Sequence, residues 1–337
     1  MNFQRLALPK LDFNVTNNCN LCCIHCCFRS GKTMLFCNFC LERIFTILKD
    51  FKQLKGRRID LTGGEPLLRK DIDLIIEMCI KDFGLKTELV TNSLLLTSEK
   101  ISVFHDLGLQ GVAISLDGSS AEKHAHIRGT SDEQYQKVLE NIRDCARAGF
   151  YTKVNSVVFA SNLEDLVNIT RLAIKLGAKE HGLYFFSPVG RGARKRKEVA
   201  DPLRWLEIIR RELIKYKNQI ELTIEVPIIE TKIARKLDLA CYLEKPWHLQ
   251  ILPSGKVYPC AIMAAHDLPL GDLYEEGLED VWKRPALWNG EYYRENVAPL
   301  MKKFHGCVDY GFSKLVASGG YQFACLCKKF KIEEICL

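Results

Sequence analysis

The chain has 337 residues, 47% of them hydrophobic, and its 48 lysines and arginines stand against 41 aspartates and glutamates. This length and apolar content exclude a disordered or fibrous protein and allow one large domain, or one domain with an appendage. The net charge of +7 is a modest excess that could favour an anionic partner, although we expect no nucleic acid among the partners.

Apolar runs stay far short of the roughly 18 to 20 residues that span a bilayer, so we expect no membrane span. Residues 1–10 lack the basic and apolar pattern of a secretory signal, which favours a cytoplasmic protein. Because the cytosol keeps thiols reduced, the 15 cysteines predict metal or iron–sulfur ligation rather than disulfides. Seven of them lie between Cys19 and Cys40 and six from Cys241 onward, a clustering that indicates two separate sites.

From residue 11 to residue 186, short β-rich apolar runs alternate with stretches of helical periodicity. Strands are predicted over residues 11–15, 58–61, 88–90, 111–116, 153–159 and 182–186, and helices over residues 40–51, 70–81, 97–106, 131–148 and 163–176. Six such units predict an α/β fold with a parallel sheet and right-handed crossovers, either doubly wound or an incomplete β/α barrel. In both architectures, ligand sites gather at the carboxyl ends of the strands.

A further helix is predicted over residues 202–216, after which the alternation stops. Residues 247–259 are typical of a β-hairpin whose turn is Pro253-Ser254-Gly255. The tail from Gly290 is rich in loops and scattered cysteines, so we expect a metal or cluster to hold it together. We therefore divide the chain into residues 1–225 and a small C-terminal hairpin- and loop-rich Fe-S extension over residues 226–337.

Directly after the first predicted strand, Cys19, Cys23 and Cys26 form a C-x3-C-x2-C pattern. Three thiolates on one loop can ligate three irons of a 4Fe-4S cluster, whereas ligation by protein alone uses four. The fourth iron then stays open, and it can chelate the amine and carboxylate of a molecule such as S-adenosylmethionine (SAM).

Further motifs follow the strands in chain order. The second strand closes with Gly63-Gly64-Glu65-Pro66, the third with Asn92, and the fourth with Ser115 and Asp117, while Arg128 supplies a guanidinium suited to a carboxylate. Together with the cysteine triplet, this series resembles the radical SAM superfamily. The resemblance implies a partial (β/α)6 TIM-like barrel in which Cys19, Cys23 and Cys26 hold the cluster. It also implies that SAM is bound by Gly63, Gly64, Glu65, Pro66, Asn92, Ser115, Asp117 and Arg128.

Other interpretations of these residues stay open. A structural zinc site prefers four nitrogen or sulfur ligands and could recruit a nearby cysteine to the triplet. Asn92, Ser115 and Asp117 could be capping or turn residues, and Arg128 could form a surface ion pair. Zinc does not require the later motifs, so the combination favours the cluster.

Cys241 and Cys260, with the downstream segments 270–273 and 278–282, resemble the SPASM/twitch extension of radical SAM enzymes, which binds auxiliary 4Fe-4S clusters. The pattern then degrades, because Cys307 alone remains of a run of four cysteines. The resemblance implies one auxiliary cluster, held by Cys241, Cys260, Cys307 and either Cys325 or Cys327. Free thiols in a vestigial loop, or a zinc site, stay open as alternatives.

The densest basic run, residues 191–197, could bind phosphates or carboxylates or could be a solvated loop. Within it, Arg191 is flanked by glycines at the predicted barrel mouth. This arginine could grip a substrate carboxylate or belong to a simple turn.

The family resemblance implies an enzyme that reductively cleaves SAM to a 5′-deoxyadenosyl radical and abstracts hydrogen from a peptide or a carboxylate-bearing metabolite. Epimerisation or cross-linking of a peptide and decarboxylation of a tetrapyrrole all fit this description, and no catalytic acid, base or hydrogen-atom donor can be assigned. An external low-potential electron donor such as ferredoxin or flavodoxin is also implied. The alternative is a non-catalytic Fe-S or zinc scaffold for electron transfer or partner binding.

Overall fold

Six parallel strands form the centre of the molecule, as the sequence predicts. The computed structural model describes residues 7–32, 38–237, 246–304, 318–324 and 329–336. The six strands are β1 (Lys10–Thr16), β2 (Arg58–Gly63), β3 (Lys86–Thr91), β4 (Gly111–Ser115), β5 (Tyr151–Val158) and β6 (Glu180–Phe185). Each pairs in parallel with the next along the chain, so their carboxyl ends share one edge of the sheet.

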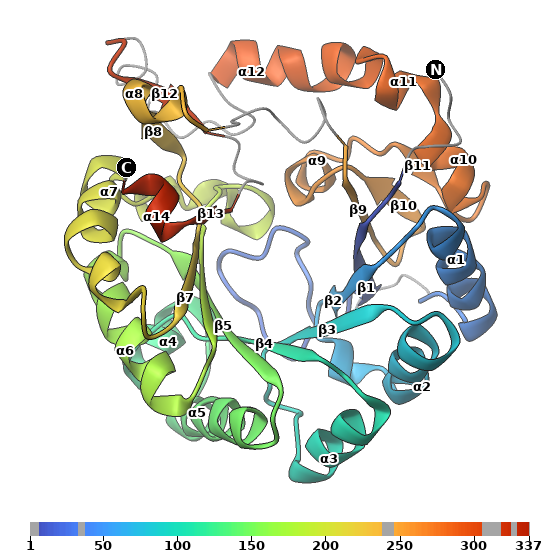
Figure 1. The fold of residues 1–337 in the computed structure, drawn as a ribbon, viewed down its shortest axis with the longest axis horizontal. Helices are drawn as coiled ribbons and strands as arrows, with labels where there is room; N and C mark the ends of the chain where they lie inside the picture. Colours follow the sequence, from blue (N-terminus) through green and yellow to red (C-terminus); the bar gives the residue numbers. More distant parts are fainter. Residues whose placement is uncertain (1–6, 33–37, 238–245, 305–317, 325–328, 337) are drawn as a thin grey trace.

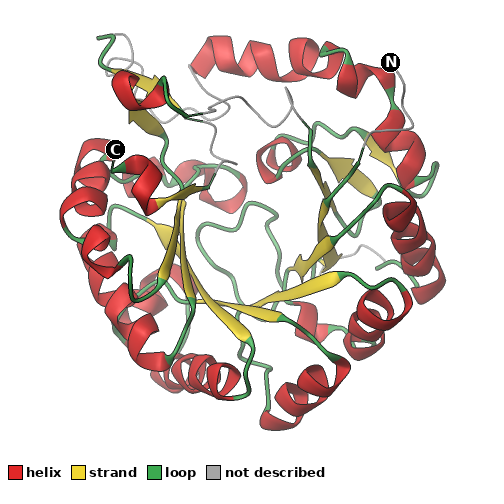
Figure 2. Ribbon diagram, in the orientation of Figure 1, coloured by secondary structure: helices red, strands yellow, loops and turns green. Residues whose placement is uncertain are grey.

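Helices cover the outer face of this sheet (Figure 2). They are α1 (Leu41–Gln53), α2 (Ile72–Glu77), α3 (Ser98–Leu107), α4 (Ala121–Arg128), α5 (Asp132–Arg147), α6 (Leu166–Leu176) and α7 (Pro202–Arg211). In α1 the buried positions Ile44, Ile47, Leu48 and Phe51 fall on one stripe, which is the helical spacing that identified this element. Helix α4 has no such stripe, and the sequence did not predict it.

Two more parallel strands flank the predicted six. Strand β7 (Glu221–Ile224) pairs with β6, and β9 (His248–Ile251) pairs with β1. Among the described residues the sheet nevertheless does not close, because its order runs β11-β10-β9-β1-β2-β3-β4-β5-β6-β7-β13. Figure 1 shows the resulting open barrel as an arc of strands around a central space. The partial barrel is therefore confirmed, and the doubly wound alternative is wrong.

The C-terminal segment joins both ends of this arc. The predicted hairpin is present as β9 and β10 (Lys256–Tyr258), and Gly255 adopts the positive φ of +88° that its turn requires. Strand β11 (Gly271–Asp272) extends the hairpin, while β13 (Phe330–Lys331) pairs with β7. A separate two-stranded sheet joins β8 (Ile228–Glu230) to β12 (Tyr321–Phe323). The division at residues 225 and 226 stays a prediction.

Short helices complete this segment. They are α8 (Thr231–Ala234), α9 (Ala261–Ala265), α10 (Leu278–Lys283), α11 (Pro285–Trp288), α12 (Ala298–Phe304) and α14 (Ile332–Ile335). Across the described ranges of the chain, no helix is long and apolar enough to cross a membrane.

The strands separate apolar from polar side chains by alternation. In β1, Leu11 and Phe13 are fully buried toward the helices, whereas Lys10 and Asp12 line a central cavity. The same period places Lys153 and Val157 of β5, and Glu180 and Tyr184 of β6, around that cavity. The hydrophobic core thus lies between sheet and helices, and the inside of the barrel is left for polar groups and a ligand.

Candidate functional site

The three predicted cluster ligands lie on one loop, residues 17–32, after the carboxyl end of β1. A hydrogen bond from Cys19 N to Gly31 O (2.8 Å) ties the two ends of this cysteine loop together. Two of the three sulfurs accept backbone N–H groups: Cys19 Sγ from Leu21 (3.4 Å) and Cys26 Sγ from Ser30 (3.3 Å). Such donors stabilise negative charge on sulfur, as metal-bound thiolates require.

Glu65 connects the ends of β2 and β3 beneath the cysteine loop. Its carboxylate is fully buried and accepts hydrogen bonds from Thr91 Oγ1 (2.6 Å) and Asn92 N (2.8 Å). Burial raises the pKa of Glu65 to about 6. Asn92 in turn donates from Nδ2 to Asn20 Oδ1 of the cysteine loop (2.8 Å) and lies 3.9 Å from Cys19 Sγ. The predicted residues Glu65 and Asn92 therefore lie together with the triplet.

A buried ion pair brings the fourth strand to the same place. Arg128 Nε donates to Asp117 Oδ2 at 2.5 Å, and Arg128 Nη1 lies 3.9 Å from Cys23 Sγ. Burial alone would raise the pKa of Asp117, but the charge of Arg128 holds it below its ordinary value. The interpretation of Arg128 as a surface ion pair is wrong, because the guanidinium is only 8% exposed.

The two glycines of the second motif are required by the packing of the backbone. A Cβ at Gly63, whose φ is +146°, would lie 2.3 Å from Thr16 O, and one at Gly64 would lie 2.2 Å from Asn18 O. Both contacts are with the chain that leads into the cysteine loop. The sequence had assigned these glycines to a backbone that lies close to a ligand. In this structure they are explained by a backbone that lies close to the cysteine loop.

The remaining predicted residues lie nearby without direct contacts to the cysteine loop among the described hydrogen bonds. Pro66 is buried and opens a 3-10 turn (Pro66–Leu68) after β2. Ser115 is half-buried at the end of β4, opposite Asn155 of β5. The side-chain Oδ1 of Asn155 is buried and has no hydrogen-bond partner in the described part of the chain.

Arg191 is a residue whose role the sequence did not reveal. Its backbone N donates to Cys26 O (2.9 Å), and its guanidinium donates from Nη1 to Cys23 O (2.9 Å) and from Nη2 to Ser30 O. The guanidinium thus holds the cysteine loop, and a contact of Arg191 with a substrate carboxylate stays a prediction. No spacing in the sequence could have shown this, because the contacts join residues more than 160 positions apart.

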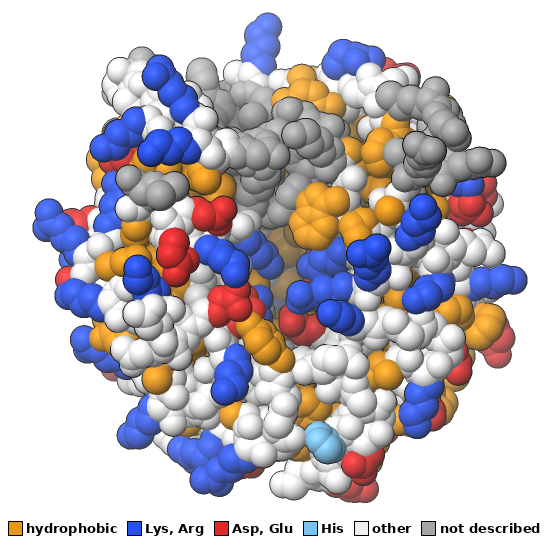
Figure 3. All heavy atoms as spheres, in the orientation of Figure 1, with side chains coloured by type: hydrophobic (Ala, Val, Ile, Leu, Met, Phe, Trp, Pro, Cys, Tyr) orange, Lys and Arg blue, Asp and Glu red, His pale blue; other side chains and the backbone are white. Residues whose placement is uncertain are grey.

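A cavity of about 810 Å³ runs through the open barrel from the cysteine loop. His25 and Cys27 of that loop line it together with Phe186, Val189 and Ile262. Nδ1 of His25 is buried without a hydrogen-bond partner in the described ranges. Figure 3 shows a central hollow with cationic and acidic side chains on either side of it and below it.

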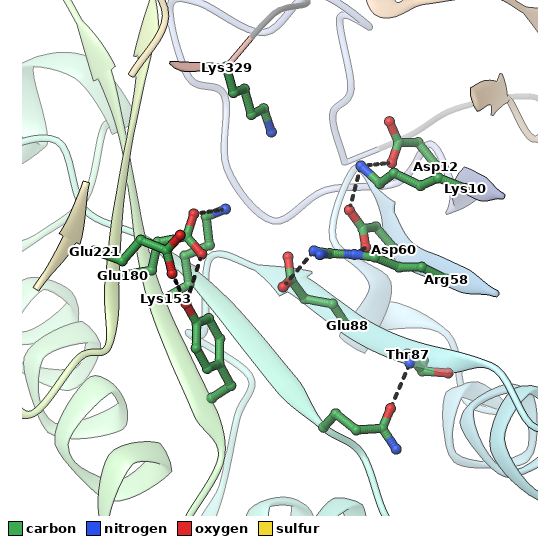
Figure 4. A network of polar contacts seen from close by, with 12 residues as sticks. Lys10, Asp12, Arg58, Asp60, Thr87, Glu88, Lys153, Glu180, Glu221 and Lys329 are labelled. Carbon is green, nitrogen blue, oxygen red and sulfur yellow. Dashed lines mark hydrogen bonds and ion pairs between the residues drawn. The ribbon is translucent and has the colours of Figure 1, made fainter. Parts of the chain in front are cut away.

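Charged residues at the amino ends of the strands form a network within this cavity (Figure 4). Lys10 Nζ lies 2.8 Å from both Asp12 and Asp60, and Lys153 lies 2.6 Å from Glu180. Lys329 lies above the ring of Tyr184, 4.5 Å from its centroid. The alternation of charged residues in the strands, Lys10 and Asp12 for example, was a sequence signal for this polar lumen that the prediction did not use.

Two segments of the sequence match known protein families. Residues 13–173 match the radical SAM superfamily, and residues 241–307 match the SPASM family, described as an iron-sulfur cluster-binding domain. The first match contains the cysteine loop and the ends of the first four strands.

The chain belongs to the radical SAM superfamily.

Its relatives within that superfamily differ in what their names say they do. The AdoMet-dependent heme synthase of Methanosarcina barkeri is 31% identical over 185 residues, which cover 55% of this chain and 52% of the relative. The PqqA peptide cyclase of Methylorubrum populi is 28% identical over 286 residues, which cover 81% of this chain and 71% of the relative. The chain thus spans about half the length of the heme synthases that it matches.

Solved structures share the radical SAM fold at lower identity. SuiB of Streptococcus suis, crystallised with SAM, superimposes with a TM-score of 0.70 at 17% identity, covering 85% of this chain and 68% of SuiB. SuiB has also been crystallised with its precursor peptide SuiA. At this identity the likeness concerns the fold.

Radical SAM proteins bind a 4Fe-4S cluster and SAM, and SPASM domains bind auxiliary iron–sulfur clusters. The side chains of the cysteine loop fit such a group. Burial raises the pKa of Cys19 to about 12 and that of Cys23 as well, so both are protonated thiols unless a bound metal compensates the thiolate charge. Within the described ranges, no three His, Cys, Asp or Glu side chains meet closely enough for one metal ion. A cubane cluster needs wider spacing, because each thiolate binds a different iron.

The predicted auxiliary ligands are described at one position. Cys260 is buried at the start of α9 and lines the barrel cavity. Cys241, Cys307, Cys325 and Cys327 lie outside the described residues. The assignment of these five cysteines to an auxiliary cluster stays a prediction.

Proposed function

We propose that this protein is an enzyme that cleaves SAM reductively and abstracts a hydrogen atom from a peptide or a carboxylate-bearing metabolite. One observation carries the proposal: the loop with Cys19, Cys23 and Cys26 lies against Asn92 and Arg128 at one end of a cavity large enough for a substrate. A structural cluster would need neither the buried guanidinium nor the cavity.

In this proposal, Cys19, Cys23 and Cys26 hold the 4Fe-4S cluster, and the buried residues beside them hold SAM. When bound, the cluster and SAM supply a one-electron cleavage that releases methionine and a 5′-deoxyadenosyl radical. Arg128, which Asp117 holds in position, would pair with the carboxylate of the methionine moiety. Glu65 holds Thr91 and Asn92 in place, so the ends of β2 and β3 keep one arrangement.

The walls of the cavity exclude water around the reacting atoms. Phe159 and Phe186 stack with their centroids 4.5 Å apart, and His25 packs edge-on against Phe159. A reactive carbon radical must be kept from solvent and stray donors, which an apolar wall achieves. No residue is assigned as a catalytic acid, base or hydrogen-atom donor.

Two substrate classes receive support from the relatives. The PqqA peptide cyclase and the peptide-bound SuiB favour a peptide substrate. The AdoMet-dependent heme synthase favours decarboxylation of a tetrapyrrole. The charged amino end of the lumen suits carboxylate or amine groups in either case.

Two further features complete the proposal. A single auxiliary cluster would be held by Cys241, Cys260, Cys307 and either Cys325 or Cys327, and as a fully ligated cluster it would carry electrons or stabilise the fold. A low-potential protein such as ferredoxin or flavodoxin would deliver the electron.

Anaerobically reconstituted protein tests the proposal directly. With SAM and dithionite it should release 5′-deoxyadenosine, and the variants Cys19→Ala, Cys23→Ala and Cys26→Ala should not. The variant Cys79→Ala is the matched control, because Cys79 is fully buried in the π-helical turn (Met78–Asp82) that follows α2 and is not among the predicted ligands. A wild-type protein that binds iron but releases no 5′-deoxyadenosine would be a non-catalytic scaffold.

A further inference from the structure

The basic run at residues 191–197 is fixed against the cysteine loop. Cys26 O accepts hydrogen bonds from two backbone N–H groups, that of Arg191 (2.9 Å) and that of Arg29 (3.3 Å). A Cβ at Gly190 would lie 2.3 Å from Cys27 O, so glycine is needed for this close approach. The two segments therefore form one continuous surface over the proposed cluster ligands.

The other end of the run is also anchored. Two consecutive 3-10 turns (Gly190–Arg194 and Arg196–Glu198) carry the chain away from the loop. Glu198 O then accepts a hydrogen bond from Ala160 N (2.9 Å), which attaches the run to the end of β5. Anchoring at both ends makes this an ordered segment rather than a free loop.

The charged side chains of the loop and of residues 191–197 are all cationic, and the carboxylate of Glu198 that follows them lies beside His126 (3.6 Å). Arg29 and Lys32 on the loop, and Arg194, Lys195 and Lys197 on the run, are all exposed. None of these five forms an ion pair with a carboxylate in the described ranges, and residues 17–32 contain no acidic residue. At the amino ends of the strands, by contrast, Lys10 and Lys153 are each paired with a carboxylate.

We propose that this basic surface is the docking site for an acidic protein that carries single electrons, of the flavodoxin or ferredoxin class. The proposal rests on the proposed function, because it assumes a cluster on the loop below. The rate of electron transfer falls steeply with distance, so a carrier must dock near the cluster. Cys22, which lies between the proposed ligands Cys19 and Cys23, is exposed, so the loop reaches the protein surface here. Complementary charge raises the rate of such encounters and fixes their orientation. On docking, the carrier loses one electron and the cluster site gains it.

The test compares binding and turnover in two triple variants. The docking variant is Arg194→Glu/Lys195→Glu/Lys197→Glu. The control is Lys137→Glu/Arg147→Glu/Lys175→Glu, which reverses three exposed cations on α5 and α6. The probe is an acidic flavodoxin, whose dissociation constant is measured in its oxidised form without turnover, at low and high salt. The release of 5′-deoxyadenosine is then measured with reduced flavodoxin and, separately, with dithionite.

We expect the docking variant to bind flavodoxin about tenfold more weakly or worse at low salt, with a matching loss of flavodoxin-driven turnover. Its dithionite-driven turnover should equal that of wild type, and the control should be unchanged throughout. Unchanged flavodoxin binding would overturn the proposal. The proposal would also be overturned if turnover fell equally with flavodoxin and with dithionite, both in this variant and in the milder Arg194→Gln/Lys195→Gln/Lys197→Gln. Such a result would mean that these residues stabilise the cysteine loop rather than bind the carrier. If dithionite gives no 5′-deoxyadenosine in wild type, the proposed function fails, while the binding measurement still tests the surface.

Discussion

Arg128 carries its positive charge in a buried position, where the carboxylate of Asp117 compensates it. A buried charge is costly when its partner is removed, because the remaining group has lost both water and its counter-ion. The sequence identified both residues through their place after the fourth strand. It could not show that Asp117 also accepts the backbone N–H of Val157 (2.6 Å), which fixes the pair to β5.

Asp117→Asn should therefore lower the free energy of unfolding by about 3–5 kcal/mol. The matched control is Arg204→Gln, which removes an exposed ion pair with Glu164 and should cost at most about 1 kcal/mol. The double variant Asp117→Asn/Arg128→Met should recover part of the stability but not SAM binding. Urea unfolding and equilibrium binding of SAM measure both effects. If Asp117→Asn lost less unfolding free energy than the control Arg204→Gln, the pair of Asp117 and Arg128 would not stabilise the fold as described.

Glu65 predicts a pH dependence of stability. Burial raises its pKa from 4.5 to about 6, so the folded protein holds this proton more tightly than the unfolded chain does. The stability contributed by the protonated carboxyl is fully present below about pH 4.5 and is lost as the pH rises through about 6. In Glu65→Gln this contribution disappears. The difference in unfolding free energy, wild type minus variant, should fall by about 2 kcal/mol between pH 4.5 and pH 7. A difference that stays constant with pH would contradict this account.

At the scale of elements, the cysteine loop is held by the turn after β2. Gly63 and Gly64 approach the backbone at Thr16 and Asn18 so closely that no side chain fits between them. Gly31, on the loop itself, has more room: a Cβ added there would meet no atom of the described residues within 4 Å, and its φ is not positive. Gly64 and Gly31 therefore offer a matched pair of substitutions.

Gly64→Ala should displace the cysteine loop and destabilise the protein by roughly 1–3 kcal/mol. Its iron content after reconstitution should fall, whereas Gly31→Ala should take up as much iron as wild type. Iron and acid-labile sulfide assays, with the midpoint of thermal unfolding, provide the comparison. Equal iron content in the two variants would show that the turn after β2 does not position the loop.

Elements with strong periodicity were predictable, and the others were not. The apolar stripe of α1 predicted a helix, and the apolar runs that alternate with helical stretches predicted the six strands. Strand β7 has only four residues and α4 lacks an apolar stripe, so their formation depends on packing against neighbours. The contacts of Arg191 are a third case, because long-range hydrogen bonds leave no pattern in local sequence.

At the scale of the whole molecule, the cavity of the open barrel has two different ends. The cysteine loop and aromatic side chains lie at the carboxyl ends of the strands, and paired charges lie at the amino ends. The sequence located the first end through its motifs. It did not locate the second, because the alternating charged residues of the strands share one direction only when the sheet curves around a lumen.

The two predicted clusters lie in different parts of the chain, so the iron content of the whole chain reports on both. Reconstituted wild type should contain about eight irons per chain, and Cys260→Ser about four, because only the auxiliary cluster loses a ligand. Cys336→Ser is the control, since Cys336 is not among the predicted ligands. About four irons in wild type would mean that the auxiliary cluster does not form.

The most direct measurement of the central claim is the electron paramagnetic resonance spectrum of the reduced Cys260→Ser protein, recorded before and after addition of SAM. If Cys19, Cys23 and Cys26 leave one iron open for SAM, the remaining cluster signal should change when SAM binds. The change should disappear when Cys23→Ala is added to the same protein. A cluster signal in Cys260→Ser that does not respond to SAM, or a response that survives Cys23→Ala, would contradict the account.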